Sequence, residues 1–210
     1  MQRIYLRSKQ VIDYKYLELG EVKHLYILLH GFKESGEKIL NTIKSTLPEN
    51  CAILSPNGNF PLPYRTETGI NYTFSWYFFD SKNKKYYIDQ AVAVDSTKQL
   101  ISHLEIDNLP KTIIGYSQGG YLAPFLGVEL SKVEKVIGIN SEFKHALLPE
   151  KMSFKLINIC HKHDPLVDFE NVYNSNKKIL ANNNNIEIHS LDLKGHAIED
   201  LTLRALKECL

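Results

Sequence analysis

Residues 112–120 read Thr-Ile-Ile-Gly-Tyr-Ser-Gln-Gly-Gly, a short apolar run followed by a glycine-rich turn. This order is typical of a buried strand that turns sharply into a helix and displays one serine hydroxyl at the turn. A side chain at Gly115 or Gly119 would collide with the backbone that lies close to so tight a turn. The stretch therefore predicts a strand–turn–helix unit with Ser117 as its candidate nucleophile.

The length and composition fit a single domain over residues 1–210. Lys plus Arg number 25 against 24 Asp plus Glu, so the chain lacks the basic surface that nucleic-acid binding requires. The three cysteines, Cys51, Cys160 and Cys209, have no metal-ligand spacing, and an odd number does not suit a disulfide framework. This favours reduced thiols and a cytoplasmic location. No run approaches the roughly 20 apolar residues that span a bilayer, so we expect no stable membrane anchor.

Strand and helix patterns alternate along most of the chain. The predicted strands, mostly short and apolar as in strands buried on both faces of a sheet, are 25–29, 52–54, 112–114, 135–139, 155–159 and 186–191. The predicted helices are 37–46, 88–103, 118–130, 169–181 and 197–209, and Pro124 should kink the third. Two alternating segments, 3–7 and 14–19, are typical of a half-exposed antiparallel pair. We therefore expect a mostly parallel, twisted α/β sheet with helices on both faces and an antiparallel N-terminal strand pair.

Residues 57–86 show no clear period over a length that loops rarely reach without a function, and we interpret them as a cap. The cap holds nine of the 22 aromatic residues of the chain: Phe60, Tyr64, Tyr72, Phe74, Trp76, Tyr77, Phe78, Phe79 and Tyr86. These side chains either line an acyl-binding groove, with Trp76 and Phe74 as candidate substrate contacts, or pack the loop down as a satellite core. Both interpretations stay open at this point.

A serine hydroxyl is a weak nucleophile at neutral pH, so it needs a base and a group that orients the base. His196 follows the last predicted strand, and Asp164 follows the strand that ends near residue 159. Both positions lie at the edge of the sheet where Ser117 is expected, because loops after parallel strands meet there. We assign His196 as the general base and Asp164 as its orienting carboxylate, with Asp168 as the nearest competitor.

The same chemistry needs N–H donors for the negative charge that develops on oxygen. The backbone N–H of Gln118, directly after the nucleophile, is one candidate. The backbone N–H of Phe32 is the second, because it lies in the loop after the predicted strand 25–29 and follows Gly31. Each such donor contributes about 3 kcal/mol in the transition state. We expect His30, in the same loop, to be structural.

Taken together, these motifs resemble the phospholipase/carboxylesterase group of α/β-hydrolases, which includes the acyl-protein thioesterases. The matching stretches are Leu29-His30-Gly31, Gly115-Tyr116-Ser117-Gln118-Gly119-Gly120 and Gly195-His196. The resemblance spans most of the chain and implies an α/β-hydrolase fold and the hydrolysis of small esters or thioesters without a cofactor. The chain departs from the family pattern at Cys160-His161, where the family usually has His-Gly, and in the aromatic stretch 76–80.

We therefore expect a monomeric or weakly dimeric serine esterase whose partner is a small-molecule ester or thioester. Two other functions stay open: a catalytically silent member of the same fold that binds an acyl or hormone-like ligand, and an acyltransferase with the same nucleophile. His161 and His163 lie two apart on one loop without the further ligands of a stable metal site, so we expect no metal.

Overall fold

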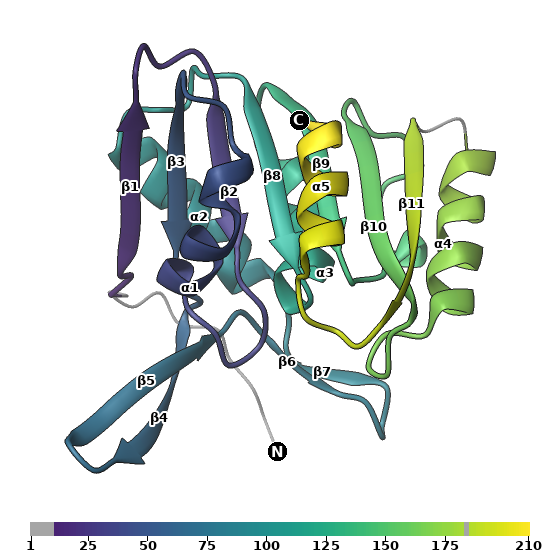
Figure 1. Ribbon diagram of the computed structural model, residues 1–210, viewed down its shortest axis with the longest axis horizontal. Helices are drawn as coiled ribbons and strands as arrows, with labels where there is room; N and C mark the ends of the chain where they lie inside the picture. Colours follow the sequence, from purple (N-terminus) through teal and green to yellow (C-terminus); the bar gives the residue numbers. More distant parts are fainter. Residues whose placement is uncertain (1–10, 183–184) are drawn as a thin grey trace.

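A seven-stranded sheet forms the centre of the protein in the computed structural model, which describes residues 11–182 and 185–210. Its strands are β1 (Tyr14–Leu19), β2 (Leu25–Leu29), β3 (Cys51–Pro56), β8 (Lys111–Tyr116), β9 (Val133–Ile139), β10 (Lys155–His163) and β11 (Ile186–Lys194). They lie in the order β1-β3-β2-β8-β9-β10-β11 (Figure 1). All neighbouring strands are parallel except β1, which pairs antiparallel with β3. The expected mostly parallel sheet with an antiparallel N-terminal pair is confirmed.

The burial of the strands explains why the sequence revealed them. Every residue of β2 and β3 is buried, as expected for strands that are covered on both faces. β1 lies at the edge of the sheet, and its residues are exposed or half-buried. All the predicted parallel strands are present and differ from the prediction only at their ends. The predicted strand at residues 3–7 lies outside the described residues.

Helices cover both faces of the sheet (Figure 1). They are α1 (Gly36–Ile43), α2 (Ala91–His103), α3 (Gln118–Glu129), α4 (Phe169–Ala181) and α5 (Asp200–Cys209), with short 3₁₀ helices η1 (Lys44–Thr46) and η2 (His145–Leu147). α1 and α5 bury apolar side chains against one face, and α2, α3 and α4 bury theirs against the other. α3 continues past Pro124, which lacks an N–H for the carbonyl of Gly120. Within the described residues, no helix is both long and apolar enough to cross a membrane.

Two helices begin later than the sequence predicted. α2 begins at Ala91 because the chain up to Ile88 belongs to strand β7 (Lys85–Ile88). α5 begins at Asp200 because Glu199 and Thr202 form a reciprocal cap there. Each of the two side chains accepts a hydrogen bond from the backbone N–H of the other residue. The residues before Glu199 are therefore left to a loop, and this loop carries His196.

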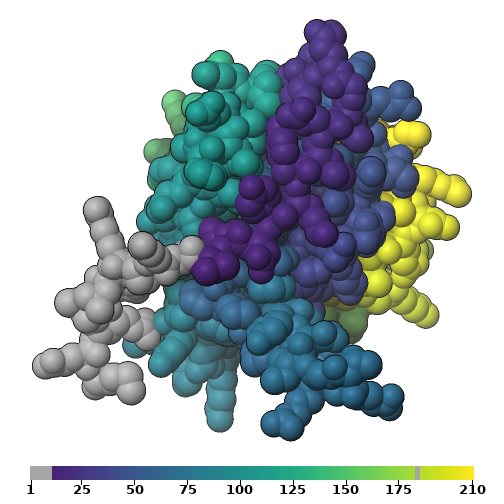
Figure 2. Space-filling model, turned by 90° about the vertical axis from the view of Figure 1, so that its left-hand side faces the viewer, coloured from purple at the N-terminus to yellow at the C-terminus, as the bar shows by residue number. Residues whose placement is uncertain are grey.

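Two β-hairpins occupy the stretch in which the sequence showed no regular pattern. They are β4 (Phe60–Thr66) with β5 (Gly69–Ser75), and β6 (Phe78–Asp80) with β7. The first hairpin stands away from the body below β1 (Figures 1 and 2). Among the described residues β4 pairs only with β5, so its other edge tolerates Pro61 and Pro63, which have no N–H to donate. Most side chains of this hairpin are exposed, and the alternation that marks a half-buried strand is therefore missing.

Candidate active site

The turn between β8 and α3 holds Ser117 in a strained backbone conformation. Its φ is 50° and its ψ is −117°, a region that a residue with a Cβ rarely adopts. Such strain persists only where the surrounding structure enforces it, and it is found most often at functional sites. The turn therefore presents the Ser117 hydroxyl at the carboxyl edge of the sheet, in the place that the sequence predicted.

Glycines around Ser117 allow three backbone segments to approach one another. A Cβ on Gly115 would lie 2.2 Å from the carbonyl oxygen of Gly119, within the same turn. A Cβ on Gly119 would lie 2.2 Å from the carbonyl oxygen of Leu29, at the end of β2. Real Cβ atoms do not approach backbone this closely, so both positions require glycine. The packing of α3 against β2 also brings the loop after β2 next to Ser117.

Three side chains from different loops form a continuous chain of hydrogen bonds. The Oγ of Ser117 lies 2.8 Å from the Nε2 of His196, and the Nδ1 of His196 lies 2.6 Å from the Oδ2 of Asp164. A carboxylate only accepts, so Nδ1 carries the proton and Nε2 is left to accept from the Ser117 hydroxyl. The loops that carry these residues follow β8, β10 and β11. The predicted convergence of the three side chains is therefore present in the structure.

The environment of Asp164 distinguishes it from its competitor Asp168. The Asp164 side chain is 1% exposed, and its Oδ1 accepts from the backbone N–H groups of Leu166 at 2.8 Å and Val167 at 3.1 Å. Two fixed donors on one oxygen leave the other oxygen aimed at His196. Asp168 instead caps α4, where its side chain accepts from the N–H of Asn171 at 2.8 Å. Asp168 is therefore a helix cap rather than the partner of the histidine.

The two predicted backbone donors belong to different loops: Phe32 lies in the loop after β2, and Gln118 begins α3 directly after Ser117. Gly31 and Glu34 close a turn around Phe32, with a backbone hydrogen bond of 3.2 Å and a second bond from the Gly31 N–H to the Glu34 carboxylate at 3.1 Å. In the described part of the chain, neither the N–H of Phe32 nor that of Gln118 donates to another protein group. Both N–H groups therefore stay candidates for the binding of an oxyanion.

A sequence comparison identifies the family to which this geometry belongs. Residues 18–210 match the family described as Phospholipase/Carboxylesterase. The chain belongs to the phospholipase/carboxylesterase family. It is thus an enzyme of the serine hydrolase type, in agreement with the expectation drawn from its motifs. A comparison with curated proteins finds no match.

Solved structures with the same fold include other esterases and a thioesterase. Esterase PE8 superposes with a TM-score of 0.74 at 16% identity, with 94% of this chain and 97% of that chain covered. The carboxylesterase of Bacillus cereus gives 0.72 at 16% identity, with 94% and 92% covered. Acyl-protein thioesterase 2 of Zea mays gives 0.65 at 16% identity, with 96% and 97% covered. At these identities the likeness establishes the α/β-hydrolase fold of this family member.

The Leu29-His30-Gly31 stretch contains a histidine that supports the loop after β2. His30 is fully buried, its Nδ1 donates to the carbonyl of Gly31 at 2.7 Å, and its Nε2 accepts from the N–H of Gly58 at 2.9 Å. The ring also stacks on Trp76 with 4.7 Å between centroids. Burial lowers the pKa of His30 to about 4. A neutral, structural His30 is therefore what the fold requires.

We expect His30 to make the stability of the protein depend on pH. Its pKa is about 4 in the folded enzyme and near 6.5 when unfolded, so between these values the unfolded chain binds more protons. The free energy of unfolding should fall as the pH drops from 6.5 towards 4, by up to about 3 kcal/mol from this group. Urea unfolding at pH 7 and pH 4.5, for the parent and for His30→Gln, checks this. The loss between the two pH values should be smaller in the variant, and equal losses would contradict the prediction.

The two aromatic residues proposed as substrate contacts lie in different environments. Trp76 is 1% exposed, packs within the core, and donates from Nε1 to the carbonyl of His30 at 2.8 Å. Trp76 therefore packs the cap down onto the main core rather than into a separate satellite core, and its burial does not support direct contact with substrate. Phe74 is half-buried, and its backbone pairs with Lys33 and Glu34 in the loop after β2, which also carries Phe32. Phe74 stays a candidate, because it lies beside that loop.

The side chain of Gln118 joins the turn between β8 and α3 to the cap, a role that the sequence does not indicate. Its Oε1 accepts from the backbone N–H of Trp76 at 3.0 Å, and its Nε2 donates to the carbonyl of Tyr77 at 2.8 Å. The hydroxyl of Ser75 lies 3.1 Å from the same Nε2. Only the residue type and its place after the nucleophile are visible in the sequence, and neither shows what the amide contacts.

We expect Gln118→Met to loosen the cap, because it keeps the side-chain length but leaves the N–H of Trp76 without its acceptor. The carbonyl of Tyr77 loses one of its two donors and keeps the Ser75 hydroxyl at 2.8 Å. Buried groups left without partners cost about 1–3 kcal/mol. The free energy of unfolding should fall by that amount, and amide exchange at Trp76 should accelerate. Gln99→Met, on the exposed side of α2, is the matched control. Unchanged exchange at Trp76 would show that the amide does not hold the cap.

Histidines near the site are engaged with neighbouring protein groups. His161 is buried and contacts Gly195 and Thr202, whereas the Nε2 of His163 lies 3.0 Å from the Oδ1 of Asp192. Across residues 11–182 and 185–210, no group of three or more His, Cys, Asp or Glu side chains is placed to hold a metal ion.

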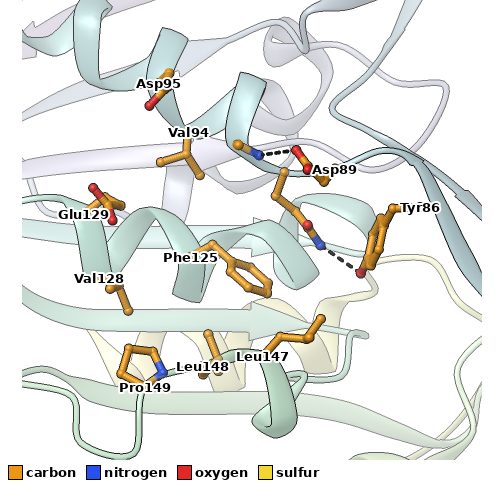
Figure 3. A pocket seen from close by; sticks show the side chains of 12 residues that line it. Tyr86, Asp89, Val94, Asp95, Phe125, Val128, Glu129, Leu147, Leu148 and Pro149 are labelled. Carbon is orange, nitrogen blue, oxygen red and sulfur yellow. Dashed lines mark hydrogen bonds between the residues drawn. The ribbon is translucent and has the colours of Figure 1, made fainter. Parts of the chain in front are cut away.

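A cavity of about 600 Å³ lies between α2, α3 and η2 (Figure 3). Its walls are formed by apolar side chains and by carboxylates, and the lining residues shown there include Val94, Phe125, Leu147, Leu148, Asp89, Asp95 and Glu129. Ser117, Asp164 and His196 do not line it. Of the nine aromatic residues of the cap, Tyr86 lines it. The cavity therefore gives no support to an acyl-binding groove built from the cap.

Proposed function

We propose that this enzyme hydrolyses carboxylic esters or thioesters through an acyl-enzyme formed on Ser117. The observation that carries the proposal is the hydrogen-bonded series from the Ser117 hydroxyl through His196 to the buried carboxylate of Asp164. Membership of the phospholipase/carboxylesterase family supports it. No other serine hydroxyl in the described residues contacts an imidazole that also binds a carboxylate.

Each group has one task in the proposed reaction. The Oγ of Ser117 attacks the carbonyl carbon while Nε2 of His196 takes its proton, and the backbone N–H groups of Phe32 and Gln118 bind the oxyanion. The imidazolium then gives that proton to the departing alcohol or thiol, which leaves the acyl group on Ser117. Water then attacks the acyl-enzyme while Nε2 of His196 takes its proton. The imidazolium returns this proton to the Oγ of Ser117, and the carboxylic acid is released. Asp164 stays ionised and stabilises the imidazolium throughout.

The proposal is tested by covalent labelling and by turnover together. An active-site-directed organophosphonate should add one equivalent to the parent protein, and the adduct should map to the peptide that contains Ser117. A short p-nitrophenyl ester should give a burst of one equivalent followed by steady turnover. Absence of both labelling and burst, with retained ligand binding, would instead indicate a silent binding protein. Acyl transfer to an added alcohol in preference to water would indicate an acyltransferase.

The wider setting of the proposed reaction rests on the sequence alone. A small-molecule ester or thioester is the proposed substrate, and no cofactor has a step in the reaction. The cytoplasmic location stays a prediction from cysteine usage, and Cys51, Cys160 and Cys209 are all free and buried in the structure. The monomeric or weakly dimeric state likewise stays a prediction.

A further inference from the structure

Two side chains hold the backbone of the residue proposed as the general base. The carbonyl oxygen of His196 accepts from the hydroxyl of Tyr116 at 3.0 Å and from the Nδ2 of Asn140 at 2.8 Å. Tyr116 directly precedes the nucleophile, and Asn140 directly follows β9. The strands β8 and β9 therefore each send one donor to a carbonyl in the loop after β11, although β10 lies between β9 and β11.

Asn140 is itself fixed on all sides. It is 1% exposed, and its φ of 46° lies in the left-handed region, which asparagine tolerates better than most residues. Its backbone N–H donates to the carbonyl of Ile159 at 2.8 Å, and its Oδ1 accepts from the backbone N–H of His161 at 3.2 Å. With Oδ1 occupied by an N–H donor, the orientation of the amide is determined and Nδ2 faces the carbonyl of His196.

His161 holds the preceding residue of the same loop. Its Nδ1 lies 3.0 Å from the carbonyl oxygen of Gly195, and its Nε2 lies 2.8 Å from the hydroxyl of Thr202. A carbonyl only accepts, so Nδ1 carries the proton and Nε2 accepts from Thr202. Both His161 and Thr202 are buried. His161 therefore connects the end of β10 to the loop that carries His196.

We propose that Tyr116 and Asn140 are positioning residues that hold the main chain of His196, so that its imidazole reaches Ser117 and Asp164 together. This inference rests on the proposed function of that histidine. The two donors act on the backbone, which leaves both ring nitrogens to the reaction. Tyr116 directly precedes Ser117, so its bond connects the base to the segment that carries the nucleophile. The centroids of the Tyr116 and His196 rings are 5.3 Å apart. Movement of the loop would therefore lengthen the contact between Ser117 and His196.

The effect should appear in kcat, because proton transfer depends on alignment and a displacement of about 1 Å costs roughly 100-fold in rate. Tyr116→Phe removes one donor, and Asn140→Asp keeps the acceptor and the left-handed conformation but removes the other donor. We expect each variant to lower kcat for a p-nitrophenyl ester by roughly 10- to 100-fold with KM changed less than about 2-fold. Tyr16→Phe, which removes a hydroxyl bound to Glu18 on β1, is the matched control and should match the parent.

A double-mutant cycle separates positioning from a general effect on structure. In a His196→Ala background a residue that acts through the imidazole has nothing left to position, so Tyr116→Phe should change the residual rate less than about 2-fold. Full additivity of the two substitutions, or a loss confined to KM, would overturn the inference. An unchanged rate in His196→Ala alone would contradict the proposed function instead. Circular dichroism and unfolding midpoints confirm that each variant is folded, and Tyr116→Phe provides the test if Asn140→Asp unfolds.

Discussion

Replacement of Ser117 by alanine is expected to lower the rate of ester hydrolysis by roughly 10⁴- to 10⁶-fold, because removal of the nucleophile of a serine hydrolase has effects of this size. Organophosphonate labelling should disappear with it. The variant should remain folded, since alanine keeps the Cβ of Ser117 and therefore the same backbone strain at φ 50°. Initial rates with a p-nitrophenyl ester, intact-protein mass spectra after labelling and thermal unfolding provide the three measurements.

Ser141 provides the matched control for this experiment. Its hydroxyl is buried near the turn between β8 and α3 and, within the described residues, has no hydrogen-bond partner. A Cβ on Gly120 would lie 2.3 Å from this hydroxyl, so Ser141 is a close neighbour of the turn. Ser141→Ala should keep both hydrolysis and labelling near those of the parent. Retained labelling in Ser117→Ala, or loss of labelling in Ser141→Ala, would show that Ser117 is not the nucleophile.

Replacement of Asp164 by asparagine is expected to lower kcat by roughly 10⁴-fold with little change in the surrounding structure. The asparagine keeps an oxygen for the N–H groups of Leu166 and Val167 and turns its NH₂ towards the imidazole. The ring of His196 then has to accept at Nδ1, which places its proton on Nε2, where it cannot take the proton of Ser117. The imidazolium formed during the reaction also loses its counter-charge. Steady-state kinetics and the rate of organophosphonate labelling measure the loss.

Asp168→Asn is the control for Asp164→Asn, because asparagine and aspartate cap helices about equally well. The unfolding midpoint and the kinetics of this variant should match those of the parent, although the same chemical change is made four residues away on the same loop. A loss of activity in Asp168→Asn comparable to that in Asp164→Asn would remove the distinction that the structure draws between the two carboxylates. Normal activity in Asp164→Asn would contradict the assignment outright.

The sequence predicts the central sheet well because most of the parallel strands contain short apolar runs. The strand at Leu25–Leu29 and the helix at Phe169–Ala181 have the predicted bounds. The former is covered on both faces, and the latter begins at a side-chain cap supplied by Asp168. These signals are local, so they can be interpreted without knowledge of the fold.

Other parts of the fold depend on contacts that the sequence does not display. The hairpin of β4 and β5 contains two prolines and exposes most side chains on both faces, so its pairing produces no periodic pattern. The start of α5 moved from residue 197 to Asp200 because a reciprocal cap between Glu199 and Thr202 decides it. The sequence contains both capping residues, but helix propensity continues upstream of them.

The residues of the candidate site also differ in whether a local sequence signal reveals them. Ser117, Asp164 and His196 follow predicted strands in the order typical of the fold, and this places them at one edge of the sheet. Tyr116 and Asn140 carry no comparable signal, because the carbonyl that they share belongs to a loop 56 residues beyond Asn140. The side-chain contacts of Gln118 were missed for the same reason.

The β4–β5 hairpin bonds to the loop after β2 only near the end of β5, as far as the described residues show. Phe74 donates to the carbonyl of Glu34 at 2.8 Å and accepts from the N–H of Lys33 at 3.0 Å. The outer end, from Tyr64 to Tyr72, is exposed to solvent. Insertions or deletions there would change the length of the hairpin without removing the two hydrogen bonds between Phe74 and the loop that carries Phe32. The length of the hairpin can thus vary during evolution or design while its attachment to the loop after β2 stays the same.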